Sequence, residues 1–523
     1  MPGGGSSNGI NPPTRRASWL FFLAVTLIYL SLSPGRIAGM GYTGHNLRAS
    51  AQILSRLGDA LAGRPAMAPI DWPKHGALEL VFELPFLAAG RLFLGDSAES
   101  DDRALSVQPI LATALLCMLI LLWVRALTGS MLWSYVVASA AAFGTMLWPY
   151  AYMGLETTPS LFLLLAAYLA LRPGSGRGWP TTLTFALSAG LAVSLKSSGV
   201  FLAPAVAFLL YASGRARSPA TTSSRAAIAK AMVAPAIVGL VFFLGAYTRS
   251  FYWSKRGQAF LTFVTDDWLA DGPLTSVANA WALYFSVNKG LLVYAPVAFL
   301  GLAVCGRAFR ADSRLVTFVV LVLAGITIAM ALFIVSSDES WGPRYLHAAV
   351  GPLVVCLGAA KGSVPFRLRR EAPLLGLSAL GLAVSLLGSL FYYGALHQAA
   401  TRVSLVRLEA FSEDLCFNHP RFNLALLRLW LRARVGFEVR PLLWPPARHW
   451  RPSPLPPSAS ARRVDLREFA HPQPAVLRDL ETVPANPGRD RLGWRFYGLC
   501  LALGLALWIA SGRLALERQP TDT

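Results

Sequence analysis

Long apolar stretches recur along the whole chain and constrain its fold more than any other feature. Polar connections separate twelve of them, which cover residues 18–33, 106–126, 131–150, 157–171, 181–195, 199–212, 231–247, 290–305, 315–335, 346–360, 374–393 and 494–511. A helix that crosses a bilayer needs about 20 predominantly apolar residues. Only 14% of the 523 residues are charged, whereas soluble proteins carry roughly a quarter. We therefore expect an all-α polytopic membrane protein with about twelve transmembrane helices.

The basic residues predict how these helices are oriented. Arg15 and Arg16 precede the first stretch, which places the N-terminus in the cytoplasm. If the spans alternate from there, the cytoplasmic segments hold 18 of the 47 Lys and Arg residues but only 4 of the 27 Asp and Glu residues. Most of the net charge of +20 is then a topology signal, and no RNA- or DNA-binding motif accompanies it. We expect both termini in the cytoplasm and no nucleic-acid partner.

The long connections fall on the outer side and suggest a division of the chain. The first, 34–105, contains a stripe from Leu47 to Leu61 that is typical of an amphipathic surface helix, followed by a second helical stretch over about 76–94. The last, 394–493, is rich in Arg and Pro and has a helix-like core at 423–435. The expected parts are a disordered cytoplasmic tail at 1–17, a transmembrane core at 18–393 with the outer loop 34–105, the outer region 394–493, and a final transmembrane helix with a tail at 494–523.

Three titratable residues share one face of the second surface helix. His75, Glu79 and Glu83 are spaced by four residues. Such a stripe could hold a divalent cation or supply a carboxylate that takes a proton from a hydroxyl. The alternative is the solvated face of an interfacial helix.

The most distinctive outer loop runs from 337 to 345. It combines Asp338, Trp341, Arg344 and Tyr345 at the mouth of a span. Arginine binds phosphate through a bidentate fork, and aromatic rings can stack on a sugar or a lipid headgroup. The alternative is an interfacial anchor built from the same residue types.

Three further charged residues lie at outer span ends. Glu156 either contributes to a site or caps the helix that it begins. Lys196 and Lys289 either hold an anionic headgroup or extend toward the membrane surface. Lys196 also separates the short fifth and sixth stretches, which are two thin spans or one re-entrant pair. The sequence has no phosphate-cradling Gly-rich loop, paired zinc spacing or nucleophile elbow, so nucleotide-powered chemistry is not expected.

Four segments together resemble a known family. They are 74–86, Trp148-Pro149-Tyr150 with Glu156 after it, 290–296 and 341–346. Their order and shared outer side resemble the C-type (GT-C fold) membrane glycosyltransferases, in particular bacterial relatives of the protein O-mannosyltransferases. The resemblance implies a GT-C arrangement of the spans, two surface helices in the first outer loop, an acidic catalytic residue and a polyprenyl-phosphate-linked sugar as donor.

One departure from this family concerns the catalytic acid. The family usually has an acidic residue just after the first span, where this chain reads Gly41-Tyr42-Thr43-Gly44-His45-Asn46. Either Glu79, Glu83 or Asp338 takes the role, or His45 substitutes as the base, or catalysis is lost. The resulting assignment has Glu83, Glu79 and Asp338 as catalytic candidates, Arg344 and Lys289 as donor phosphate ligands, and as substrate-binding residues His75, Glu156, Trp341 and Tyr345.

The expected function is sugar transfer on the outer face of a bacterial inner membrane. The acceptor would be a glycan, a lipid or a protein, the membrane lipid itself is a partner, and a divalent cation is an open option. The alternatives are a transporter or flippase of a lipid-linked saccharide and a catalytically inactive scaffold with the same fold.

Overall fold

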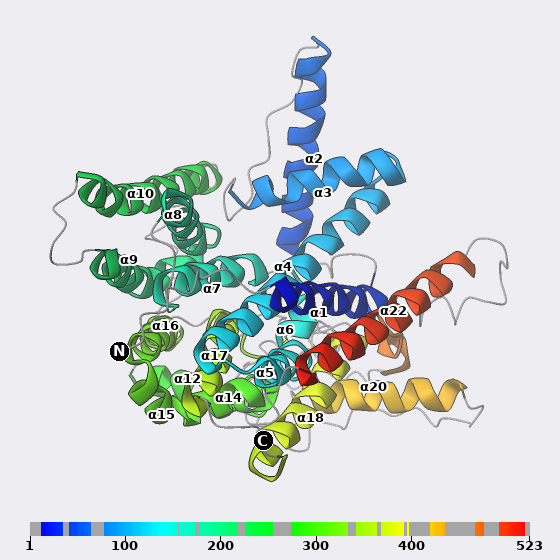
Figure 1. The fold of residues 1–523 in the computed structure, drawn as a ribbon. Helices are drawn as coiled ribbons and strands as arrows, with labels where there is room; N and C mark the ends of the chain where they lie inside the picture. Colours follow the sequence, from blue (N-terminus) through cyan, green and yellow to red (C-terminus); the bar gives the residue numbers. More distant parts are fainter. Residues whose placement is uncertain are drawn as a thin grey trace.

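The protein is helical throughout the part that the structure describes. The computed structural model describes residues 12–34, 41–63, 78–154, 156–172, 178–217, 225–254, 273–332, 341–362, 368–391, 395–396, 419–434, 466–474 and 491–517. Within these ranges there are nineteen α-helices and a few short 3-10 turns, and no strand. The expected all-α class is confirmed (Figure 1).

The helices follow the apolar stretches closely. Their bounds are α1 Pro12–Ser31, α2 Gly41–Leu61, α3 Leu78–Leu94, α4 Ala98–Thr128, α5 Met131–Phe143, α6 Leu147–Tyr150, α7 Thr157–Leu171, α8 Trp179–Ser194, α9 Ala203–Arg217, α10 Arg225–Ser254, α12 Pro273–Phe285, α13 Leu291–Tyr294, α14 Pro296–Ala303, α15 Cys305–Ala311, α16 Ser313–Leu332, α17 His347–Lys361, α18 Leu368–Leu390, α20 His419–Arg434 and α22 Arg491–Leu516. Each of the twelve apolar stretches coincides with one or more of these helices.

Several helices are suited to a membrane by length and composition. Four described helical segments are long and apolar enough to cross a bilayer, namely Ser100–Thr128, Ser313–Ala331, Glu371–Leu390 and Arg495–Leu516. Four shorter apolar helical segments accompany them, namely Met131–Phe143, Thr157–Leu171, Gly199–Gly214 and Met232–Thr248. These helices indicate a multi-pass membrane protein. The total of twelve spans stays a prediction.

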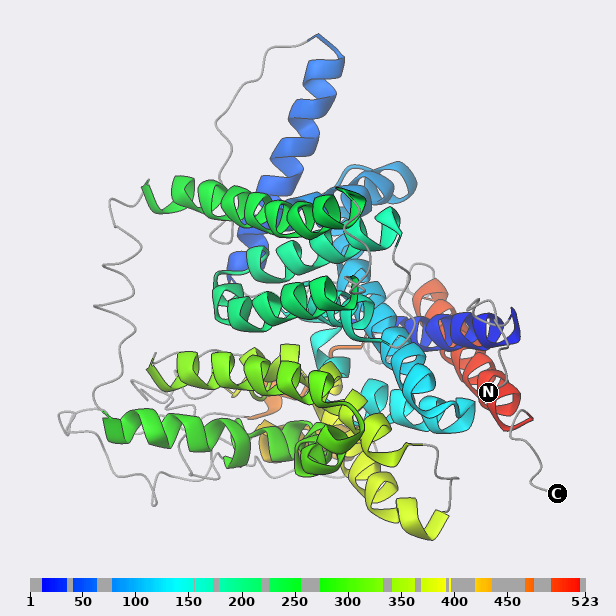
Figure 2. The same ribbon diagram turned by 60° about the vertical axis from the view of Figure 1, so that its left-hand side comes forward.

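The helices pack in groups that Figure 2 separates. The group α7 to α10 lies in one layer, and the group α12 to α18 lies in another. The first and last helices, α1 and α22, pack along each other at the side of the bundle. Helix α17 lies in the centre and contacts α4, α7, α14 and α16, so its side chains are almost all buried. The main apolar core therefore joins both layers.

Both helices expected within residues 34–105 are present. Helix α2 covers the Leu47–Leu61 stripe, and α3 contains the expected Glu79, Glu83 and Pro85. In both views α2 projects from the body (Figures 1 and 2). Ala49 and Ser50 are buried against the body, while Leu57 and Leu61 further along the helix are exposed. That α2 lies on a membrane surface stays a prediction.

Part of the region 394–493 packs against α18 and the residues that follow it. Its expected helical core appears as α20, which lies beside α18 (Figure 1). A small apolar cluster joins the two elements; it contains Phe391, Ala395, Leu396, Phe422, Leu426, Leu429, Leu466 and Ala470. The Gln473 backbone N–H also donates a hydrogen bond to the Leu390 carbonyl at 2.7 Å. This part of the region is therefore anchored at the end of α18.

Candidate functional site

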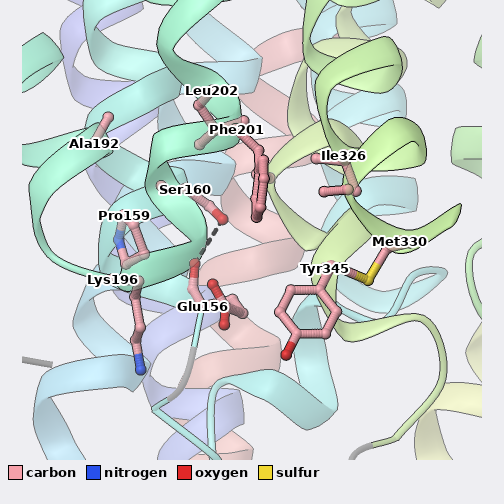
Figure 3. Close-up of a pocket in the computed structure, with 13 residues that line it drawn as sticks. Glu156, Pro159, Ser160, Ala192, Lys196, Phe201, Leu202, Ile326, Met330 and Tyr345 are labelled. Carbon is pink, nitrogen blue, oxygen red and sulfur yellow. Dashed lines mark hydrogen bonds between the residues drawn. The ribbon is translucent and has the colours of Figure 1, made fainter. Parts of the chain in front are cut away.

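A small pocket lies at the seam between the two layers of helices. Its walls come from α7, α8 and the 3-10 turn η1 (Ser197–Leu202) on one side and from α16 and α17 on the other (Figure 3). The polar residues that line it are Glu156, Ser160, Lys196 and Tyr345. The pocket is small, with a cavity volume of about 20 Å³.

A break between two helices brings Lys196 to the pocket. Helix α8 ends at Ser194, and the chain passes through Lys196 in an extended conformation before η1 begins. The chain folds back tightly here, because a Cβ at Gly199 would lie 2.6 Å from the Val193 carbonyl oxygen. The polar segment between the fifth and sixth apolar stretches is therefore a sharp turn that presents a lysine.

Lys196 forms an ion pair with Glu79, one of the predicted catalytic acids. Its Nζ lies 3.3 Å from Oε1 of Glu79 on α3, and the Lys196 side chain is only 2% exposed. Lys196 is thus buried and paired instead of extending to the membrane surface. A buried ammonium group is tolerated because an opposite charge faces it.

Glu156 and Arg344 form a second buried ion pair. The Arg344 Nε donates a hydrogen bond to Oε1 of Glu156 at 3.1 Å, and both side chains are 9% exposed. Glu156 occupies the position before the first residue of α7, but its side chain makes no capping hydrogen bond. The Glu156 carboxylate therefore pairs with Arg344 and does not cap helix α7. The Arg344 guanidinium also lies 5.4 Å from the centre of the Tyr345 ring.

A buried hydrogen-bond chain supports this second pair. The Ser160 hydroxyl donates to the Glu156 carbonyl at 2.6 Å, as the dashed line in Figure 3 marks. Because that hydroxyl has only one proton, the His347 Nδ1 at 2.8 Å must be the donor to Ser160 Oγ. Ser160 follows Glu156 by one helical turn, and His347 follows Arg344 by three residues. The chain of hydrogen bonds thus links the backbone of Glu156 at the start of α7 to His347 at the start of α17.

The sequence reasoning missed Ser160 and His347 as parts of this arrangement. His347 is fully buried at the start of α17, and its ring lies 5.0 Å from that of Tyr150. A histidine at the start of an apolar span was a detectable signal, because buried polar side chains in membrane helices have partners. Ser160 carried no such signal, since serine is common in membrane helices.

Two contacts hold α3 and therefore Glu79 in place. The Ser50 hydroxyl on α2 donates to Oε2 of Glu83 at 2.7 Å. Arg91 donates two hydrogen bonds, of 3.0 and 2.8 Å, to the carboxylate of Asp101 on α4, and these bonds raise the pKa of Arg91. Glu83 does not line the pocket. The two acids that share one face in the sequence thus have different partners.

Trp341 packs beneath the turn that presents Arg344. Its indole is fully buried, edge-on to Tyr294 at 5.3 Å and to His419 of α20 at 5.7 Å between ring centres. The next residue, Gly342, has φ +66°, and a Cβ there would lie 2.6 Å from Cγ of Tyr294. Trp341 therefore anchors the turn in this structure, and no face of its ring is open to a ligand.

The remaining predicted site residues lie elsewhere or outside the described residues. Lys289 is buried in the turn between α12 and α13 and does not line the pocket. His75, Asp338 and the side chain of His45 lie outside the described residues. Among the described residues, no group of three His, Cys, Asp or Glu side chains could hold a metal ion. The proposed cation at His75 stays a prediction.

Comparisons with known proteins add no family to this description. No protein-family model, no curated protein and no solved structure matches the chain. A functional conclusion therefore depends on the residues of the pocket and on the sequence resemblance.

Proposed function

We propose that the protein is a membrane glycosyltransferase that moves a sugar from a polyprenyl-phosphate donor to a glycan, lipid or protein acceptor. The proposal includes twelve spans in a GT-C-like arrangement, cytoplasmic termini and a pocket that opens on the outer face of a bacterial inner membrane. The observation that carries it is that Glu156 and Lys196 line one pocket and form ion pairs with Arg344 and Glu79, so that four separate parts of the chain supply charges at or beside it. Three of these four residues belong to the segments that resemble the family.

The arrangement suits transfer of a sugar from a phosphate. The acceptor oxygen attacks the anomeric carbon, the bond from that carbon to the phosphate oxygen breaks, and the phosphate leaves with the electron pair. Lys196 and Arg344 supply positive charge for the leaving phosphate. A carboxylate takes the proton of the acceptor hydroxyl. Glu79 is the first candidate for this base, because its side chain is 15% exposed and it lies beside a pocket residue.

The test is consumption of a labelled donor by the purified protein. The full-length protein in lipid nanodiscs is incubated with a panel of radiolabelled polyprenyl-phosphate sugars and a membrane extract as the source of acceptors. We expect one donor to be consumed and the Glu79→Gln variant to be slower by about 100-fold, as for loss of a general base. Asp96→Asn is the matched control, because it removes an acid of the same outer loop whose side chain is 81% exposed. Consumption of no donor would refute the proposed transfer, and equal rates for Glu79→Gln and the parent would refute Glu79 as the base.

A transporter or flippase of a lipid-linked saccharide is the second candidate. The break between α8 and α9 favours it, because discontinuous membrane helices often form the substrate sites of transporters. Movement of a labelled lipid-linked saccharide across vesicles that contain the protein, without covalent transfer, would support this function. An inactive scaffold, which the missing acid at 41–46 suggests, would show neither activity.

A further inference from the structure

Two charged residues, Glu156 and Lys196, line the pocket, and each is paired with a residue of opposite charge that does not line it. Glu79 faces Lys196, and Glu156 faces Arg344, so these four charges sum to zero. A phosphate that entered a buried site of this kind would lose its hydration and meet cations that are already paired. Binding of an anion is favourable here only if one carboxylate gives up its cation.

The two ion pairs differ in the exposure of their carboxylates. The Glu156–Arg344 pair is a hydrogen bond of 3.1 Å between side chains that are both 9% exposed. The Glu79–Lys196 pair, at 3.3 Å, joins a 15% exposed carboxylate to a lysine that is only 2% exposed. Glu79 is therefore the more exposed of the two carboxylates, while Lys196 is buried in the pocket wall.

We propose that a phosphate group binds Lys196 by displacing Glu79, which occupies the place of the phosphate in the structure described here. Lys196 is then an anion ligand of the pocket, and arrival of the phosphate releases the Glu79 carboxylate. The role of the released carboxylate as the base rests on the proposed sugar transfer, whereas the exchange itself does not. In that reaction the base becomes available only after the donor is in place, so the donor binds before the acceptor.

The exchange is tested by binding alone, without acceptor or sugar. The probes are radiolabelled farnesyl phosphate and, in a second arm, inorganic phosphate, each added to the full-length protein in nanodiscs of neutral lipid. Glu79→Gln removes the competing charge, so we expect farnesyl phosphate to bind about tenfold more tightly, which corresponds to about 1.4 kcal/mol. Asp96→Asn removes one negative charge from the same outer loop and should leave the affinity unchanged. Lys196→Gln should weaken binding and abolish the gain from Glu79→Gln when the two are combined.

Each outcome has a defined meaning. A gain with farnesyl phosphate alone supports a lipid-phosphate site, and a gain with both probes supports a general phosphate site. Equal affinity of Glu79→Gln and Asp96→Asn for both probes would overturn the exchange. If Glu79→Gln does not fold, Glu79→Asp lengthens the contact and should give a smaller gain. The binding gain without donor consumption by the parent would leave the exchange standing and remove the proposed transfer.

Discussion

The Glu156–Arg344 pair offers a quantitative test of the site geometry. Both side chains are 9% exposed and the Nε–Oε1 distance is 3.1 Å, so solvent screens their interaction weakly. Glu156→Gln leaves the Arg344 charge buried without the Glu156 carboxylate. Arg344→Gln leaves the Glu156 carboxylate buried without the Arg344 guanidinium. Loss of one partner of a buried pair costs about 3–5 kcal/mol of unfolding free energy, mainly because a lone charge remains inside. The double variant removes both charges, so we expect its loss to be no larger than that of one single variant.

The assay is a double-mutant cycle of unfolding in a mild detergent. Urea-induced unfolding of the parent, both single variants and the double variant gives a coupling energy, which we expect to be about 3 kcal/mol or more. Asp96→Asn is the control, because its carboxylate is 81% exposed and lies 3.4 Å from Arg91, and exposed pairs contribute about 0–1 kcal/mol. Additive losses in the two single variants would refute the reasoning, since they would mean that the two charges do not depend on each other.

Two further predictions concern the turn after Trp341 and the projecting helix α2. Gly342→Ala combines a φ of +66° with a Cβ 2.6 Å from Tyr294, so it should cost about 2–4 kcal/mol of unfolding free energy. Gly129→Ala is the control, because Gly129 has a φ of +69° and no neighbour near its Cβ position, and it should cost only about 1–2 kcal/mol. Equal losses in the two variants would contradict a role for the contact with Tyr294. Leu61→Asp on α2, where the side chain is 90% exposed, should change the unfolding free energy by less than about 0.5 kcal/mol. The same variant should speed tryptic cleavage at Arg56 in nanodiscs, and an unchanged cleavage rate would show that lipid does not cover α2.

The helices were predictable because each depends on a local pattern. The apolar runs gave the position of α4, α16, α18 and α22, and the stripe from Leu47 to Leu61 gave α2. The interruptions were harder to predict. The stretch 290–305 forms α13 and α14 with a break at Ala295, and 131–150 forms α5 and α6 with a break after Phe143. Hydropathy averages over such breaks, because the residues around them stay apolar.

The charged members of the candidate site were predictable, whereas their pairs were not. Glu156, Arg344 and Tyr345 are charged or aromatic residues at span ends, and Glu79 belongs to the titratable stripe on the second surface helix. Their partners are set by how distant helices pack, and 188 residues separate Glu156 from Arg344 along the chain. An argument from a single helix therefore favoured extension of Lys196 toward the membrane surface, since it could not include the carboxylate on α3. For the same reason the sequence places Glu79 and Glu83 on one helix face as a single group, whereas in the structure Glu79 pairs with Lys196 and Glu83 accepts a hydrogen bond from Ser50.

Helix α20, within the region 394–493, helps to position the turn that carries Arg344. His419 of α20 packs against Trp341, and the Asn423 side chain donates a hydrogen bond to the Leu387 carbonyl on α18 at 2.9 Å. Gly388 follows Leu387, and a Cβ there would meet the Trp341 indole at 2.4 Å. Helices α18 and α20 therefore hold one indole between them, and that indole lies three residues before Arg344. Since the position of Arg344 sets the Glu156 pair, a region outside the resemblance to the glycosyltransferases contributes to the geometry of the pocket itself.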